Sequence, residues 1–189
     1  MKLHYDRPAE YFEEALVIGN GTMGATLYGG VKKDKISFND ITLWTGEPES
    51  ENSSPDAFNV IPEIRALLDN EDYEGADKAQ YKVQGHYSEN YQPLGTLTIE
   101  YLDDTAGISD YHRWLDIGNA TARTQYLKDG KLFTSDYFAS APDSVIVIRL
   151  KSENKKGIHA LLSFDSPLPH SSQVADNEIS VEGYAAYHS

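Results

Sequence analysis

A glycine-rich segment near the N-terminus most constrains how this chain can fold. Residues Gly19–Gly24 have the spacing G-x-G-x-x-G, and Asp40 follows downstream, a combination found in dinucleotide-binding folds. In that fold the third glycine begins a helix whose amide groups bind a pyrophosphate. Here only Ala25–Tyr28 separates Gly24 from the next glycine pair, which is too short for a crossover helix. The segment therefore predicts two short strands joined by a glycine turn.

Strands are also predicted along most of the second half of the chain. Leu97, Ile99 and Tyr101 alternate with polar residues, as expected of a strand with one buried face. Asp129-Gly130 separates two further strand-like segments and is a strong hairpin signal. Val145–Ile148 is an unbroken apolar run, too short for a helix, and predicts a central strand covered on both faces.

Between these strand regions the sequence predicts a helical insertion at about 55–85. Ser54 is suited to cap the first helix and Pro55 to begin it, while Asn70 is suited to cap a second helix that ends at Gly85. Apolar residues of the first helix recur at helical spacing, namely Val60, Ile61, Ile64, Leu67 and Leu68. The predicted fold class is mainly β, an antiparallel β-sandwich with a short two-helix insertion, in one domain spanning 1–189.

Composition excludes several classes of function. The chain has 189 residues, no cysteine and a net charge of -14. Thiolate metal sites and cysteine nucleophiles are therefore excluded, and so is a nucleic-acid partner, which requires clustered Lys and Arg. The sequence contains no apolar run long enough to span a membrane. We expect no signal peptide, because residues 1–6 lack an apolar core.

The sequence shows no arrangement of catalytic or metal-binding groups. The six histidines are far apart and form no metal-ligand motif, so we expect neither a metal nor a cofactor. Acidic residues cluster at Glu13-Glu14 and Asp103-Asp104, but glycoside hydrolysis needs two carboxylates on opposite sides of the scissile bond. Neighbouring residues in a loop do not provide that separation, so solvated surface charge is the better interpretation.

Several motifs, in order, resemble the N-terminal domain of glycoside hydrolase family 95, the family of inverting α-L-fucosidases. The resemblance spans Pro8 to Tyr184, and Thr22-Met23 departs from the family pattern. The motifs are Val17-Ile18-Gly19-Asn20-Gly21, Gly29-Gly30-Val31, Asn39-Asp40, Leu43-Trp44 with Gly46, Ile64–Leu68, Tyr91–Gly95, Tyr111–Asp116, Phe138–Asp143 and Val145–Leu150.

The resemblance implies a role and a location for the protein. In this family the domain is a super-sandwich whose neighbour is a separate C-terminal (α/α)6 barrel carrying the catalytic residues. We therefore expect a non-catalytic domain that supports this barrel, and assign no catalytic residue to the chain. The resemblance also implies a periplasmic or extracellular protein and a sandwich that is incomplete at its C-terminal end.

Four residues in the family-like motifs are candidates for the substrate rim or the domain interface. Asn20 lies between two glycines, Asn39 precedes Asp40, Trp44 lies in a loop before Gly46, and Gln92 enters a strand. A tryptophan ring can stack on a sugar or fill a domain interface, and amides at turns either bind ligands or stabilise the turn. We expect Asn20, Trp44 and Gln92 to share one face of the domain.

Two other roles stay open at this point. The chain could be a stand-alone carbohydrate-binding module that presents an aromatic platform to an oligosaccharide, or a structural interaction domain. A sandwich that lacks its final strands exposes unpaired backbone groups and an apolar face. We therefore expect self-association through an exposed sheet edge or face.

Overall fold

The computed structural model describes residues 1–46, 54, 56–85 and 88–186, and these fall into two compact units. The first unit comprises Met1–Trp44 and Tyr91–Ala185, and the second comprises Thr45–Asn90 with Ala186–Ser189. The larger unit contains all the strands, and the smaller one contains both helices.

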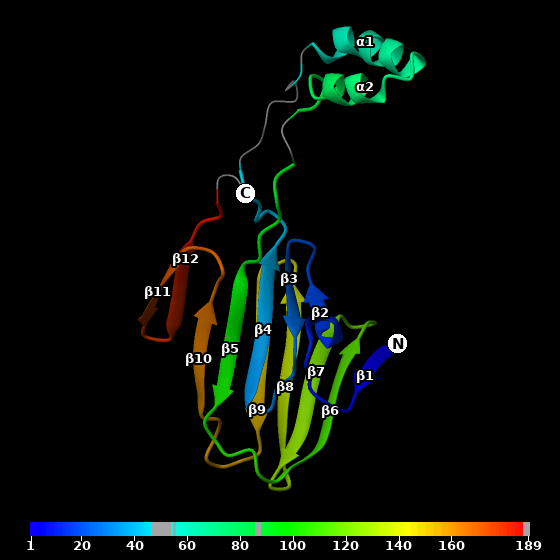
Figure 1. Ribbon diagram of the computed structural model, residues 1–189. Coiled ribbons are helices and arrows are strands. Elements are labelled where there is room, and N and C mark those ends of the chain that lie inside the picture. The colour runs from blue at the N-terminus through cyan, green and yellow to red at the C-terminus, as the bar shows by residue number, and fades with distance from the viewer. Residues whose placement is uncertain (47–53, 55, 86–87, 187–189) are drawn as a thin grey trace. The chain divides into compact units, whose positions relative to one another are not determined.

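The larger unit is a sandwich of two antiparallel sheets with an additional hairpin (Figure 1). Sheet A has the order β1 (Lys2–Tyr5), β6 (Ile108–Asp116), β7 (Thr121–Lys128), β8 (Lys131–Ser140) and β9 (Val145–Ser152). Sheet B has the order β10 (Ala160–Asp165), β5 (Gly95–Tyr101), β4 (Lys33–Asp40), β3 (Met23–Leu27) and β2 (Leu16–Gly19). The hairpin pairs β11 (His170–Ala175) with β12 (Glu178–Gly183), and a short 3-10 helix covers Phe12–Glu14. The predicted antiparallel β-sandwich is confirmed.

Alternation of side chains builds the core between the two sheets. In β4 and β5, Ile36 lies opposite Leu97 and Asp34 opposite Ile99, so these residues face sheet A while their neighbours face outward. The buried apolar residues are Leu16, Ile18, Ala25, Leu27, Ile36, Ile99, Tyr101, Ala122, Tyr126, Phe133 and Tyr137. Burial of such side chains stabilises the fold by about 1.5–3 kcal/mol for each large one.

The two predicted turns at Gly19–Gly24 and Asp129-Gly130 are confirmed as hairpin turns. Asp129 and Gly130 have φ angles of 50° and 72°, as a two-residue type I′ turn requires. They join β7 to β8, with Lys128 opposite Lys131. Gly21 has a φ of 95° in the turn between β2 and β3, and the third glycine, Gly24, lies in strand β3 and not at the start of a helix.

The prediction that Val145–Ile148 forms a central strand is wrong. These residues begin β9, which is the last strand of sheet A and pairs only with β8 among the described residues. Val145 is exposed, whereas Ile146 and Ile148 pack on the core. An apolar run shows that a strand has no strictly polar face, but the position of that strand in a sheet depends on which segments pair with it.

The smaller unit is a helical hairpin of α1 (Ala57–Asp69) and α2 (Tyr73–Gln80). The predicted insertion is confirmed, but both predicted caps are wrong. Asp72 caps α2 by accepting a hydrogen bond of 2.9 Å from the Gly75 N–H, while Asn70 ends α1 and donates to the Ala66 carbonyl. Ser54 lies before α1 and donates to the Gln84 carbonyl. Pro55 lies outside the described residues.

Neither helix in the described part of the chain is long and apolar enough to cross a membrane.

Candidate functional site

The four predicted site residues lie at one end of sheet B, which we call the sheet B tip. Asn20 is in the β2–β3 turn, Asn39 is near the end of β4, and Trp44 and Gln92 lie in the segments that follow β4 and precede β5. Two backbone bonds connect these segments: the Ile41 N–H donates to the Thr22 carbonyl, and the Gln92 N–H donates to the Leu43 carbonyl, both at 2.9 Å.

The amide of Asn20 stabilises its own turn. Its Oδ1 accepts hydrogen bonds from the backbone N–H groups of Thr22 and Met23, at 3.0 and 2.8 Å, and its Nδ2 donates to the Ser140 carbonyl at 2.9 Å. The last of these bonds connects the tip of sheet B to the end of β8 in sheet A. Both ends of the amide are used inside the domain, so Asn20 acts as a turn residue.

Trp44 presents an apolar ring at the tip. Its Nε1 donates to the Ile41 carbonyl at 2.9 Å, and its ring meets Tyr91 edge to face, with centroids 5.7 Å apart. Trp44 is 48% exposed and is therefore outside the sandwich core. Gln92 is half-buried beside it, and Asn39 has a buried Oδ1 without a hydrogen-bond partner. Because the polar atom of Trp44 is bonded within the domain, the exposed part of this side chain is hydrocarbon.

A second family-like motif, Tyr111–Asp116, holds the sandwich together. The Tyr111 hydroxyl donates to the Gly29 carbonyl at 2.6 Å. Arg113 is fully buried, donates to the backbone carbonyls of Arg7 and Glu14 at 2.7 and 2.8 Å, and lies over the Tyr5 ring. These contacts attach the N-terminal segment to β6, so the motif is explained by packing.

Asp34 has a raised pKa, but its role is structural and not catalytic. It is 1% exposed between the sheets, and burial raises the pKa of its carboxyl. Tyr137 donates to Oδ2 at 2.7 Å and the Gly30 N–H donates to Oδ1 at 2.9 Å. A catalytic acid needs a raised pKa together with access to substrate, and Asp34 has only the first.

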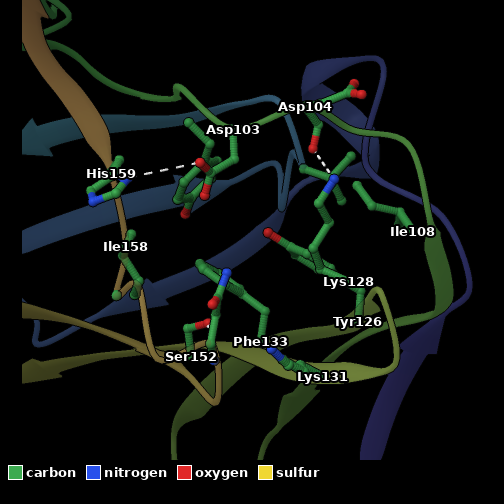
Figure 2. Close-up of a pocket in the computed structure, with 14 residues that line it drawn as sticks. Asp103, Asp104, Ile108, Tyr126, Lys128, Lys131, Phe133, Ser152, Ile158 and His159 are labelled. Carbon is green, nitrogen blue, oxygen red and sulfur yellow. Dashed lines mark hydrogen bonds and ion pairs between the residues drawn. The ribbon is translucent and has the colours of Figure 1, made fainter.

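The opposite end of the sandwich contains a small cavity with a mixed polar and apolar lining (Figure 2). It has a volume of about 40 Å³, and its lining includes Asp103 and His159, whose Oδ1 and Nδ1 atoms lie 3.8 Å apart. Lys128 closes one side by donating to the carbonyls of Asp104 and Ala106. A cavity of this size holds a water molecule or two and is too small for a sugar ring. Within the described ranges, no group of three or more His, Asp or Glu side chains could hold a metal ion.

The outer face of sheet A contains a groove that the sequence analysis missed. The volume of this groove is about 610 Å³.

The floor of this groove is an ion-pair ladder beside an aromatic ring. Arg123, Asp136 and Arg149 lie opposite one another on β7, β8 and β9, and both arginines bond the Asp136 carboxylate, Arg149 at 2.7 Å. Burial alone would raise the pKa of Asp136, but the hydrogen bonds from the two arginines outweigh it and hold this pKa below its usual range. Lys2 and Arg123 both lie within 6 Å of the Trp114 ring centroid, at 5.8 and 5.7 Å.

The register of the β7–β8 hairpin is a signal that could have located this ladder. A two-residue turn at Asp129-Gly130 places Lys128 opposite Lys131 and, five residues further along each strand, Arg123 opposite Asp136. The pairing with Arg149 depends in addition on the register of β9. The groove combines charged hydrogen-bonding groups with a ring, which suits recognition of a polar ligand rather than acid–base chemistry.

Comparison with known proteins identifies the family. Residues 3–188 match the family described as glycosyl hydrolase family 65, N-terminal domain. The chain is 33% identical over 175 residues to alpha-L-fucosidase 2 of Arabidopsis thaliana, covering 92% of this chain and 21% of that protein. It is 27% identical over 145 residues to the probable alpha-fucosidase A of Aspergillus oryzae, covering 74% of this chain and 20% of that protein. It is 30% identical over 160 residues to the probable alpha-fucosidase A of Aspergillus niger, covering 79% of this chain and 20% of that protein.

The chain thus spans about a fifth of the length of these curated relatives. The predicted resemblance to family 95 is supported, because the relatives are α-fucosidases and the matching family is a glycoside hydrolase N-terminal domain. The chain belongs to the glycosyl hydrolase family 65 N-terminal domain family and is an N-terminal domain of the fucosidase-like glycoside hydrolases.

Proposed function

We propose that this chain is the non-catalytic N-terminal domain of a glycoside hydrolase resembling inverting α-L-fucosidases, and that it packs against and supports a C-terminal (α/α)6 catalytic barrel. The observation that carries the proposal is the match over residues 3–188 to an N-terminal domain family, combined with relatives of which the match covers only about a fifth. The burial of Asp34 supports the non-catalytic role. Its carboxyl has the raised pKa of a catalytic acid, but it lies between the two sheets, where a substrate does not reach it.

The sheet B tip is the surface we propose for contact with the barrel. Ile41, Trp44, Tyr91 and Leu94 are exposed there, and a cluster of exposed apolar side chains marks an interaction surface. The amide of Asn20 is already bonded within the domain, so the tip offers mainly hydrocarbon. These contacts favour domain packing over direct binding of sugar.

A chimera tests this proposal. We would replace the matching N-terminal segment of the Arabidopsis alpha-L-fucosidase 2 with this chain and assay hydrolysis of an aryl α-L-fucoside. The chimera should be active and the isolated chain inactive, since the barrel supplies the catalytic groups. Fucosidase activity that copurifies with the isolated chain would contradict the non-catalytic role.

Variants of the chimera test the contact surface. Trp44→Ala should lower the melting temperature of the chimera more than that of the isolated chain, because only the chimera contains the barrel. Tyr11→Ala is a matched control, since Tyr11 is an exposed aromatic residue away from the tip. Equal effects of Trp44→Ala in both proteins would show that the tip is not the contact surface.

The groove on sheet A favours a second candidate function, recognition of an oligosaccharide. Trp114 and the Arg123–Asp136–Arg149 ladder line it, and rings together with a few fixed polar groups are typical of ligand sites. Calorimetric titration with a fucosylated oligosaccharide tests this function. Binding that Arg149→Ala abolishes would support it, and the absence of binding heat and of chemical-shift changes would refute it.

A further inference from the structure

The groove on the outer face of sheet A carries more positive than negative charge, unlike the chain as a whole. Its lining contains three cations, Lys2, Arg123 and Arg149, and two carboxylates, Asp116 and Asp136. The whole chain has 16 Lys and Arg against 30 Asp and Glu. Because exposed charges more than about 8 Å apart are largely screened at physiological salt, a ligand in the groove responds mainly to this local excess. The groove therefore suits an anionic group.

The two arginines of the groove keep hydrogen-bond donors for a ligand. Arg123 bonds the Asp136 carboxylate through Nε, and Arg149 bonds it through Nε and Nη2. Within the described ranges these guanidinium groups form no other hydrogen bond, although each guanidinium has five N–H donors. Their side chains are 41% and 56% exposed. Asp136 therefore fixes the position of both arginines and leaves part of each guanidinium accessible.

An exposed aromatic ring lies beside these cations. Phe138 is 39% exposed and follows Asp136 by two residues on β8, so both side chains point to the outer face. Thr121 and Val147 lie opposite Phe138 on the two neighbouring strands. Aromatic side chains together with a few fixed polar groups are typical of small-molecule sites. An inorganic anion would use only the arginines, whereas a sugar ring also gains the contact with the phenyl ring.

We propose that this groove binds a sugar residue that carries a carboxylate, as in a uronic acid oligosaccharide. The inference rests on the second candidate function proposed above, recognition of an oligosaccharide, and specifies the class of ligand. The carboxylate accepts hydrogen bonds from the remaining N–H groups of Arg123 and Arg149, and the sugar ring packs against Phe138. Hydrogen bonds between charged groups are stronger than those to a neutral hydroxyl, and a guanidinium matches the planar shape of a carboxylate.

Calorimetric titration with two matched ligands tests the class of ligand. The ligands are a trisaccharide of galacturonic acid and its methyl ester, which has the same sugar rings without the charge. The wild-type chain should bind the acid at least about tenfold more tightly than the ester, and added salt should weaken binding of the acid alone. Equal affinity for the two would overturn the inference but leave oligosaccharide recognition intact. No binding of either trisaccharide or of a fucosylated oligosaccharide would overturn both.

Variants test which residues bind the ligand. Arg149→Gln should weaken binding of the acid by about tenfold or more and leave binding of the ester nearly unchanged, because it removes charged donors. Lys33→Gln is the matched control, since it removes one positive charge from an exposed position on β4 in sheet B. Phe138→Ala should weaken binding of both ligands. If Lys33→Gln weakens binding of the acid as much as Arg149→Gln, net charge and not the groove governs binding, and the inference fails.

Two further measurements complete the test. Thermal unfolding shows which variants remain folded, and Arg123→Gln replaces Arg149→Gln if the latter does not fold. The fucosidase chimera described above should bind the acid as tightly as the isolated chain does, because the surface proposed for the barrel is the sheet B tip and not this groove. Loss of that binding in an active chimera would show that the rest of the enzyme covers the groove, and would overturn the inference.

Discussion

The buried pair Asp34–Tyr137 should make a large and pH-dependent contribution to stability. The Tyr137 hydroxyl donates to Asp34 Oδ2 at 2.7 Å, and both side chains are 1% exposed. Tyr137→Phe removes this donor and leaves a buried carboxyl oxygen without its partner. A hydrogen bond to a charged group contributes about 1.5–3 kcal/mol, and one between neutral groups about 1 kcal/mol.

The sign of the pH dependence follows from the raised pKa of Asp34. Burial raises this pKa above its unfolded value, so the folded state binds the proton more tightly. The stability from this group is fully present below the unfolded pKa of about 3.9 and is lost as pH rises through the folded pKa. Tyr137 offsets part of that loss by bonding the carboxylate. The cost of Tyr137→Phe should therefore be about 2–3 kcal/mol where Asp34 is ionised and about 1 kcal/mol where it is protonated.

Urea unfolding at a series of pH values, from acidic to mildly alkaline, measures both values. Tyr11→Phe is the control for loss of a hydroxyl, because Tyr11 is exposed, and it should change the free energy of unfolding by less than about 0.5 kcal/mol. A cost for Tyr137→Phe that is this small at every pH, or that is equal across the series, would refute the reasoning.

Three further predictions follow from the packing. Burial raises the pKa of four tyrosines, Tyr101, Tyr111, Tyr126 and Tyr137. The contribution of these tyrosines to the stability of the fold is therefore present below about pH 10 and lost above it. Absorbance titration should show them ionising only as the protein unfolds. Gly29→Ala should lower the free energy of unfolding in urea by about 2–4 kcal/mol, because φ at Gly29 is 70° and the new Cβ would lie 2.6 Å from the Tyr111 hydroxyl. Gly21→Ala is the control and should lower it by about 1 kcal/mol, because the space around Gly21 is open. Asp136→Asn should cost about 1 kcal/mol at neutral pH and less in acid, because the lowered pKa of Asp136 gives stability that is lost as pH falls; an equal cost at both pH values would contradict this.

Local chemistry made several features predictable from the sequence. Asp129-Gly130 specifies a hairpin because both residues tolerate a positive φ, and the turn then sets the register of two strands. The alternation in β5 identifies its buried face for a similar reason, since side chains on a strand point to opposite sides. The turn at Asn20 and the absence of a helix after Gly24 follow from residues close together in the chain.

Tertiary structure alone decided which strands are central, which groups are buried and where the exposed apolar surface lies. Val145–Ile148 has the composition of a central strand but forms an edge, because no described segment pairs with its other side. Asp34 is buried by Tyr137, which lies 103 positions away. Leu161 and Leu162 are chemically identical neighbours, and only the pairing of β10 with β5 places Leu162 on the same side of sheet B as the buried Ile99 and Leu161 on the side of Glu100. Local rules act over a few residues, whereas burial depends on segments that meet only after the chain has folded.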